Sequence, residues 1–216
     1  MEANLLSNKK YIIAYNLGTT GNKSTIFDDE GNLVASAFSG YRTYYPNRLW
    51  VEQNPKDWWN AICNVTKELL EKSKINICSI VCLTFSGQMM GCVPVNKDGE
   101  FLGRALIWAD QRGVKQAEKL IFKLGKEYIY KIVGKLKKSI ALELDLIEGI
   151  PIVIGGGDGC CAAAGAGVIS PGVAYQYLGS SSWIGLATEK PIVDPQMRTF
   201  NWIHVIPGLY SPTGTM

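Results

Sequence analysis

The sequence predicts an α/β protein, with a mixed β-sheet and flanking helices. Three observations support this fold class. Three short strands are followed by one amphipathic helix and a further buried strand, in the order β-β-β-α-β. A strand, a glycine turn and a helix of small residues follow one another from residue 150 to residue 169. Residues 174–186 then repeat a strand, turn and strand pattern that resembles residues 16–26, as a weak internal repeat.

The first half of the chain begins with three predicted strands, at residues 11–16, 23–28 and 32–38. The turn at residues 28–31, Asp-Asp-Glu-Gly, joins the second strand to the third, which predicts a three-stranded antiparallel opening. Asn54 then reads as a helix N-cap, with Pro55 at the first helical position and Asp57 in the first turn. Apolar residues follow at helical spacing: Trp58, Ile62, Val65, Leu69 and Leu70. Residues 76–85 are apolar on both faces, which is typical of a central parallel strand.

The second half of the chain predicts a hairpin over residues 93–107 and helices over residues 111–130 and 135–146. Residues 150–154 form a short apolar strand, and residues 155–158, Gly-Gly-Gly-Asp, form a turn that leads into a helix at residues 160–165. Residues 150–169 contain one charged residue, but six glycines and the central Asp158 argue against a membrane span.

Charge and cysteine usage exclude several classes of protein. The 216 residues carry 22 Lys+Arg and 19 Asp+Glu, and the densest basic run is only Lys135, Lys137 and Lys138. This composition excludes a disordered chain, and the basic residues form no stripe along which a nucleic acid could bind. The six cysteines lack C-x-x-C spacing, so we expect reduced core thiols in a cytoplasmic protein. The N-terminus lacks the pattern of a secretory signal.

A glycine-threonine turn at residues 16–23, Asn-Leu-Gly-Thr-Thr-Gly-Asn-Lys, predicts a phosphate-binding segment. Its backbone N–H groups and hydroxyls can donate to phosphate oxygens, and Lys23 supplies a countercharge. An ordinary hairpin turn is the alternative interpretation of the same residues. Asp158 follows a buried strand at a helix N-terminus, where the helix dipole favours the ionised carboxylate. It is therefore a candidate general base, with a simple helix cap as the alternative.

Two further segments follow predicted strand ends, where ligands bind in α/β sheets. Gln88 and Asp110 can hydrogen-bond sugar hydroxyls, and Trp108 can stack on a sugar ring or chain. Met89 and Met90 lie beside Gln88, with core filling as their alternative role. For Arg112 a structural ion pair is the alternative to a site role.

Five motifs occur in the order of a known family, and the chain resembles the FGGY family of carbohydrate kinases over residues 11–216. The motifs are Asn16-Leu17-Gly18-Thr19-Thr20-Gly21-x-Lys23, Trp50-x-Glu52-Gln53-x-Pro55-x-x-Trp58-Trp59, Gly87-Gln88-Met89-x-Gly91, Ile107-Trp108-x-Asp110-x-Arg112 and Gly155-Gly156-Gly157-Asp158. The resemblance implies the actin-like, ribonuclease-H-like ATPase fold, ATP and Mg²⁺ as cofactors, and transfer of the γ-phosphoryl group to a sugar hydroxyl.

The resemblance also assigns expected roles to residues. The catalytic base falls on Asp158, and the sugar contacts fall on Gln88, Met89, Met90 and Trp108. The phosphate contacts fall on Gly18, Thr19, Thr20 and Lys23, and in the second domain on Gly179, Ser180 and Ser181. We expect residues 1–172 to form the N-terminal sugar-binding domain and residues 173–216 to begin the nucleotide-binding domain, which would leave that domain incomplete and the chain inactive as it stands.

Three departures from the family pattern qualify the expected reaction. Asn16 stands where the family has the aspartate that holds the metal, and an amide oxygen is a poorer magnesium ligand. Met90 stands where xylulose-specific members usually have histidine. An internal stretch is missing near residues 132–133.

We expect a pentulose kinase acting on D-xylulose. The alternatives are a kinase for ribulose, gluconate or glycerol, and a non-catalytic sugar-binding protein. The expected partner is a small sugar, with no nucleic acid and no membrane, and a homodimer is one expected assembly.

Overall fold

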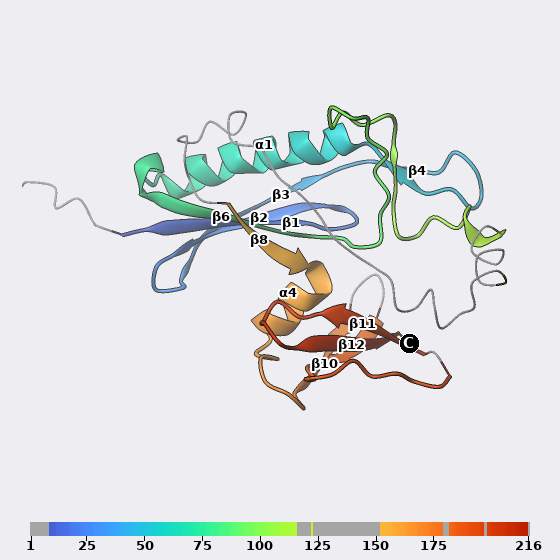
Figure 1. Cartoon of the computed structure of the whole chain (residues 1–216). Coiled ribbons are helices and arrows are strands. Elements are labelled where there is room, and N and C mark those ends of the chain that lie inside the picture. The colour runs from blue at the N-terminus through green and yellow to red at the C-terminus, as the bar shows by residue number, and fades with distance from the viewer. Residues whose placement is uncertain (1–8, 116–121, 123–151, 179–181, 197, 216) are drawn as a thin grey trace, which may run out of the picture. The chain divides into compact units, whose positions relative to one another are not determined.

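The computed structural model describes residues 9–115, 122, 152–178, 182–196 and 198–215 (Figure 1). The chain divides into two compact units, which are treated separately below. The first unit takes in Met1–Leu83 and Gln88–Pro151, and the second takes in Thr84–Gly87 and Ile152–Met216.

The first unit is built on three antiparallel strands, β1 (Tyr11–Leu17), β2 (Gly21–Asp28) and β3 (Leu33–Gly40). This confirms the predicted three-stranded opening. The Asp28 carboxylate organises the β2–β3 turn by accepting hydrogen bonds from the backbone N–H groups of Glu30 and Asn32, at 3.1 and 2.8 Å.

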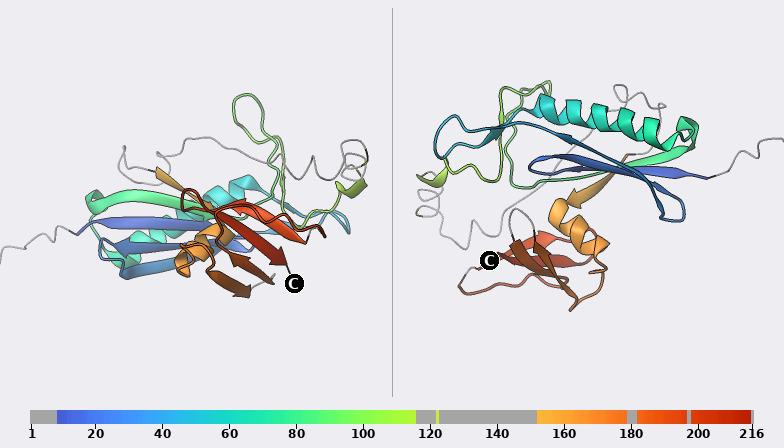
Figure 2. Two further views of the ribbon diagram at one scale, coloured as in Figure 1. Left: turned by 60° about the horizontal axis from the view of Figure 1, so that its bottom comes forward. Right: turned by 180° about the vertical axis from the view of Figure 1, so that it is seen from behind.

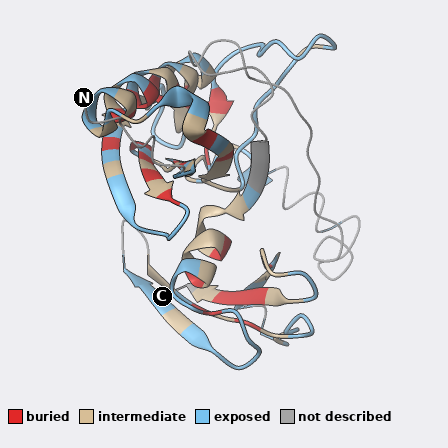
Figure 3. Ribbon diagram, turned by 90° about the vertical axis from the view of Figure 1, so that its left-hand side faces the viewer, coloured by how far each residue is buried: buried red, intermediate tan, exposed pale blue. Residues whose placement is uncertain are grey.

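Helix α1 (Pro55–Ser73) begins where the sequence predicts, because the Asn54 side chain accepts the N–H of Lys56 at 3.1 Å. It contacts β2 and β3 and buries one face against them (Figure 3). That face consists of Ala61, Ile62, Val65, Thr66 and Leu69. Burial of each large aliphatic side chain contributes roughly 1.5–3 kcal/mol, so this face holds the helix on the sheet.

Strand β6 (Ile80–Gly87) starts four residues later than the sequence predicts. Asn76 instead caps a short 3-10 turn (Ile77–Ser79), accepting the N–H of Cys78 at 2.9 Å. This local side-chain bond competes with the extended conformation and delays the strand. The larger sheet has the order β3-β2-β1-β6-β8, and Thr84–Gly87 of β6 are grouped with β8 in the second unit.

A small sheet in the first unit has the order β4-β5-β7, formed by β4 (Thr43–Tyr44), β5 (Glu52–Gln53) and β7 (Ala105–Leu106). Isolated bridges join Cys92 to Leu106 and Val95 to Phe101, which confirms the predicted hairpin. The helix predicted over residues 135–146, and most of the helix predicted over residues 111–130, lie outside the described residues.

The second unit contains β8 (Ile152–Gly157), helix α4 (Asp158–Gly165) and a four-stranded antiparallel sheet (Figure 2). The order in that sheet is β11-β12-β10-β9, formed by β9 (Ala174–Leu178), β10 (Ser182–Leu186), β11 (Thr199–Ile203) and β12 (Tyr210–Thr215). The pairing of β9 with β10 confirms the predicted strand-turn-strand unit. Ala163, Val168 and Ala187 form a buried cluster, with Tyr175 and Leu209 packed against it.

The prediction that residues 155–157 form a turn is wrong, because all three glycines belong to β8. A Cβ atom on Gly155 would lie 2.7 Å from the backbone oxygen of Phe85 in β6, and one on Gly156 would lie 2.6 Å from Val205. The glycines are needed for close packing of the strand rather than for a turn.

The cysteines depart from the predicted core thiols. All six are free, but only Cys160 is buried, whereas Cys78 and Cys92 are exposed. Burial raises the pKa of the Cys160 thiol to about 11, which keeps it protonated and unreactive near neutral pH. Among the helices that the structure describes, none has the length and apolar character needed to cross a membrane.

Candidate functional site

The turn between β1 and β2 presents backbone donors and hides its acceptors. We call Gly18, Thr19 and Thr20 the donor turn. The Gly18 carbonyl accepts from the Tyr41 hydroxyl, the Thr19 carbonyl accepts from Gln53 Nε2 at 2.7 Å, and the Thr20 carbonyl accepts from the Tyr41 N–H at 3.4 Å. Within the described part of the chain, the N–H groups of Thr19 and Thr20 have no hydrogen-bond partner. Such a turn suits an anion, because the protein donors already occupy its carbonyl oxygens.

The shape of the donor turn depends on Gly21. The Gly18 N–H donates to the Gly21 carbonyl at 3.1 Å and closes the turn. A Cβ atom at Gly21 would lie 2.5 Å from the Phe38 ring and 2.8 Å from the Ser39 backbone oxygen. The ring could shift but the strand oxygen could not, so only glycine fits between β1 and β3 at this point.

Trp108 contacts the donor turn directly. Its indole N–H donates to the Thr19 hydroxyl at 3.0 Å, and 40% of the residue remains exposed. Lys23 is exposed on β2 and lies directly opposite Asn16 of β1 in the strand register. Paired residues of antiparallel strands share one face of the sheet, so the ammonium and the amide lie on the same face.

Gln53 of β5 connects the donor turn to the segment that follows β6. It is fully buried, and its Nε2 donates to the Thr19 carbonyl at 2.7 Å and to the Thr43 hydroxyl at 2.9 Å. Its Oε1 accepts from Trp58 Nε1 at 3.0 Å and from Gln88 Nε2 at 2.9 Å. Every donor and acceptor position of this amide is therefore used.

The predicted sugar loop, Gln88-Met89-Met90, is fastened at its first residue. The Gln88 N–H donates to the Leu17 carbonyl at 2.8 Å, next to the donor turn. Gln88 Oε1 is buried and has no hydrogen-bond partner among the described residues. Met89 is half-buried, whereas Met90 is 63% exposed and has a φ of 60°, in the left-handed region. A non-glycine residue held in the left-handed region has a strained backbone, and such residues cluster at ligand sites.

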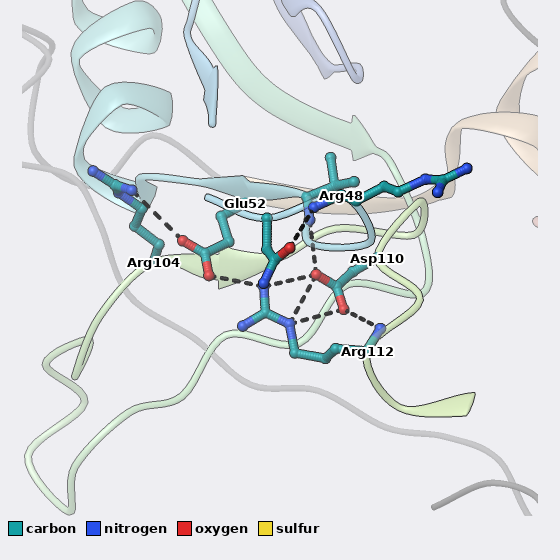
Figure 4. Close-up of polar contacts among 7 residues, drawn as sticks. Arg48, Glu52, Arg104, Asp110 and Arg112 are labelled. Atoms are coloured by element: carbon teal, nitrogen blue, oxygen red, sulfur yellow. Dashed lines mark hydrogen bonds and ion pairs between the residues drawn. The ribbon is translucent and has the colours of Figure 1, made fainter. Parts of the chain in front are cut away.

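The carboxylate of Asp110 is occupied by protein donors (Figure 4). It accepts from Arg112 Nε at 2.9 Å, from the Arg112 N–H at 3.0 Å and from the Val51 N–H at 2.8 Å. Arg112 also bonds Glu52 at 2.8 Å and stacks on the Trp50 ring, 4.1 Å from its centroid. Hydrogen bonds from Arg112 lower the pKa of Asp110 below its usual range. This is the structural ion pair considered as the alternative for Arg112.

Asp158 lies in the second unit, as the first residue of α4. Its Oδ1 accepts the N–H of Gly159 at 2.9 Å, and Tyr175 donates its hydroxyl to the Gly159 carbonyl at 2.8 Å. Burial raises the pKa of Asp158 despite the backbone hydrogen bonds that lower it. The sequence led us to expect that the helix dipole would favour the ionised carboxylate, but the effect of burial on the pKa is larger. The half-buried carboxylate is therefore a stronger base than an ordinary aspartate.

The described residues do not fit a magnesium ion bound directly by protein ligands. They contain no group of three or more His, Cys, Asp or Glu side chains arranged to hold a metal. Asn16 offers an uncharged amide and faces Lys23 across the sheet. Mg²⁺ prefers charged oxygen ligands and keeps much of its water, so Asn16 is a poor anchor for it.

Within the first unit, the structure brings Trp108 and Gln88 together with the donor turn. Asp158 belongs to the second unit. Gly179, Ser180 and Ser181 lie outside the described residues. Sequence reasoning missed the roles of Gln53, Tyr41 and Trp58 in fixing these segments. Gln53 and Trp58 lie in a motif that the sequence did single out, but nothing in the motif shows which groups they contact.

Comparison with known proteins identifies the family of the chain. Residues 11–139 match the N-terminal domain of the FGGY family of carbohydrate kinases. The chain is 32% identical over 104 residues to a glycerol kinase of Rippkaea orientalis. This match covers 48% of this chain and 21% of that protein. It is 22% identical to a xylulose kinase of Staphylococcus epidermidis over 293 residues, with 95% of this chain and 59% of that protein covered.

The fold agrees as well. The crystal structure of a xylulose kinase from Rhodospirillum rubrum matches with a TM-score of 0.83 at 17% identity, over 96% of this chain and 60% of that one. This confirms the predicted actin-like ATPase fold. The chain spans 21%, 59% and 60% of the lengths of these three kinases, in the order given. On the match over residues 11–139, the chain belongs to the FGGY family of carbohydrate kinases.

Proposed function

We propose that this chain takes part in ATP-dependent transfer of a γ-phosphoryl group to a hydroxyl of a pentulose, with D-xylulose as the first candidate. Residues 1–172 would supply the sugar-binding domain, and residues 173–216 the first strands of the nucleotide-binding domain. The match to the Staphylococcus epidermidis kinase extends over 293 residues, more than this chain contains, which supports an internal segment missing near residues 132–133.

The observation that carries the proposal is the position of Thr19 between two sets of residues. Its carbonyl is bound by Gln53, its hydroxyl is bound by Trp108, and its N–H is left without a partner among the described residues. An anion-binding turn is thereby joined to the aromatic side chain and the Gln88 loop expected to bind a sugar. Phosphoryl transfer needs these two kinds of group held in one place.

The chemistry follows from groups of known polarity. The N–H groups of the donor turn and the Lys23 ammonium would hold negative charge on the phosphates. The sugar hydroxyl oxygen would form a bond to the γ-phosphorus while the bond to the β-phosphate oxygen breaks and ADP leaves. The Asp158 carboxylate would take the hydroxyl proton, and its raised pKa suits that task.

The choice of D-xylulose rests on the resemblance of the five motifs, taken together, to xylulose kinases. The Gln88-Met89 pair disfavours glycerol, because glycerol-specific members carry an arginine-containing loop there. Kinases for ribulose, gluconate or glycerol remain the alternatives, and glycerol kinases are among the relatives. Asn16 favours a second candidate function of another class, a sugar-binding protein without catalysis, because the residue lacks the charge that would anchor a metal.

Two measurements test the proposal. Isothermal titration of the purified chain with D-xylulose, D-ribulose, D-gluconate and glycerol identifies the sugar that binds. Sugar-dependent ADP release, measured with the same four compounds in a version completed with the rest of the nucleotide-binding domain, then separates a kinase from a sugar-binding protein. We expect D-xylulose to bind to the chain and to stimulate ADP release in the completed version. Binding without stimulated release would favour the non-catalytic alternative, and binding of none of the four would contradict both.

A further inference from the structure

Helix α4 has little side-chain bulk with which to hold its first turn in place. After Asp158 it consists of glycine, cysteine and alanine residues, of which only Cys160 and Ala163 are buried. Gly159, the second residue of the helix, has no side chain at all. Packing of large side chains therefore cannot fix the direction in which the Asp158 carboxylate points.

Both backbone groups of Gly159 are bound instead. Its N–H donates to Asp158 Oδ1 at 2.9 Å, and its carbonyl accepts from the Tyr175 hydroxyl at 2.8 Å. Tyr175 lies on β9 directly opposite Gly185 of β10, and a Cβ atom on Gly185 would lie 2.7 Å from the Tyr175 ring. The ring also packs against the buried cluster that includes Ala163. The hydroxyl therefore ties the first turn of α4 to a fixed point on the sheet.

The direction of the Tyr175 hydroxyl is set by a second aromatic residue. The indole N–H of Trp183 can only donate, and it donates to the Tyr175 oxygen at 3.0 Å. The Gly159 carbonyl can only accept, so the Tyr175 proton must lie toward it. Trp183 is stacked in turn on the Tyr177 ring, with centroids 4.0 Å apart and planes 10° from parallel. Burial raises the pKa of Tyr175, which keeps the hydroxyl protonated and able to donate at neutral pH.

We propose that Tyr175 is a positioning residue for the general base: its hydroxyl, oriented by Trp183, holds the first turn of α4 so that the Asp158 carboxylate keeps one direction. The inference rests on the proposed function and deepens it by naming the side chains that place the proton acceptor. A general base must lie within hydrogen-bond distance of the proton that it takes. A small displacement of the carboxylate should therefore lower the rate of reaction without weakening sugar binding.

Three single variants test this in a version completed with the rest of the nucleotide-binding domain. Tyr175→Phe removes the hydroxyl but keeps the ring, and it should lower kcat roughly 10- to 10²-fold while KM for D-xylulose stays within about twofold. Trp183→Phe keeps a ring against Tyr177 but removes the N–H, and it should lower kcat roughly three- to tenfold. Tyr177→Phe is the matched control. It removes a hydroxyl that makes no hydrogen bond among the described residues, so kcat should stay within about twofold of the wild-type value.

A double-mutant cycle separates positioning from a general structural role. If Tyr175 acts through Asp158, Tyr175→Phe should change the residual rate of Asp158→Asn by less than about twofold, because no carboxylate remains to be positioned. Loosening of the whole unit would instead lower the rate equally with and without the carboxylate. Equal losses in the two backgrounds overturn the inference, and so does a wild-type kcat in Tyr175→Phe.

The chain itself supplies a readout that needs no turnover. Because the Gly159 N–H donates to Asp158 Oδ1, ionisation of the carboxylate should shift the Gly159 amide resonance in proton–nitrogen correlation spectra. This pH-dependent shift should fall by roughly half or more in Tyr175→Phe and stay unchanged in Tyr177→Phe. A full-sized shift in Tyr175→Phe overturns the inference whatever the kinase assay gives.

Thermal unfolding followed by circular dichroism checks that each variant is folded. If Tyr175→Phe does not fold, Trp183→Phe is carried through the same cycle and the same spectra and is read in the same way. A completed protein that phosphorylates no sugar, or an unchanged kcat in Asp158→Asn, would overturn the proposed function, and this inference with it. Loss of kcat in Asp158→Asn with no effect of Tyr175→Phe would overturn this inference alone.

Discussion

The indole N–H of Trp108 donates to the hydroxyl of Thr19 at 3.0 Å, joining two residues that lie 89 positions apart in the sequence. Trp108 is expected to contact the sugar, and Thr19 belongs to the turn expected to contact phosphate. One hydrogen bond thus connects the two functions proposed for the first unit.

Thr19→Val should raise the dissociation constant for D-xylulose by roughly three- to tenfold, because the indole N–H loses its partner and the ring is less well held. Isothermal titration measures the change. Thr20→Val is the control, since it removes a neighbouring hydroxyl of the donor turn, whereas the Trp108 indole N–H donates to Thr19. Equal losses of sugar affinity in the two variants would show that Trp108 does not bind the sugar through this arrangement.

Asp110→Asn should lower the free energy of unfolding by roughly 1–3 kcal/mol, because Arg112 and the Val51 N–H lose a charged partner that is only 5% exposed. Sugar affinity should stay within about twofold of the wild-type value, since the carboxylate is already occupied. Urea unfolding and titration with D-xylulose measure the two quantities. A loss of sugar binding without a loss of stability would restore the role of sugar contact predicted from the sequence.

The same ion pair predicts a pH dependence. The folded-state pKa of Asp110 lies below the ordinary value of 3.8, so its contribution to stability is present above that value. It is lost as the pH falls toward the lowered pKa. The difference in unfolding free energy between wild type and Asp110→Asn should therefore narrow on acidification below 3.8. A difference that stays constant there would contradict the ion-pair account.

In the same completed version of the protein, with the rest of the nucleotide-binding domain, Asp158→Asn should reduce kcat by roughly 10²–10⁴ while sugar affinity changes only a few-fold, because the variant keeps the shape but cannot accept the proton. Steady-state ADP release and isothermal titration give the two values. The wild-type rate should fall as the pH drops through a pKa above 3.8, since the base must be ionised. An unchanged kcat would mean that Asp158 only ends the strand and starts the helix.

The raised pKa also makes a prediction about stability. Burial penalises the Asp158 carboxylate, so the folded state binds its proton more tightly than the unfolded state does. Stability is then lost as the pH rises through the raised pKa. Asp158→Asn should melt at a higher temperature than wild type at neutral pH, and the difference should shrink below pH 3.8. A lower melting temperature at neutral pH would show that the carboxylate is stabilised in the fold.

In a version completed with the rest of the nucleotide-binding domain, Asn16→Asp should raise kcat and lower the magnesium concentration needed for half-maximal rate, because a charged oxygen holds the ion and its water shell more firmly. Lys23, directly opposite in the register, offers the new carboxylate a countercharge. A magnesium titration of sugar-dependent ADP release compares the two proteins. If the variant is no faster at any magnesium concentration, Asn16 does not lie at the metal or the protein is not a kinase.

The elements that could be predicted from the sequence are those whose cause is local. Asn54 and Pro55 mark the start of α1 through capping geometry, and the structure places it there. The β2–β3 turn follows from Asp28, whose carboxylate accepts two backbone N–H groups nearby. In both cases the decisive hydrogen bonds join residues within four positions of one another.

The features that could not be predicted depend on contacts between distant residues. Gly155 resembles a turn former in sequence, but its place in β8 is set by the backbone of Phe85. Gln53 carries no local signal for its role, because its four partners are spread from Thr19 to Gln88. The candidate site could therefore be named residue by residue, but the amide that organises it could not.

The most direct test of the account is detection of the reaction product. A version of the protein completed with the rest of the nucleotide-binding domain is incubated with ATP, magnesium and D-xylulose, and mass spectrometry looks for a phosphorylated pentulose, with Asp158→Asn as the matched control. The account predicts a pentulose phosphate from the completed protein and roughly 10²–10⁴-fold slower formation in the variant. Absence of a phosphorylated product from D-xylulose, D-ribulose, D-gluconate and glycerol alike, in a chain that is folded, would contradict it.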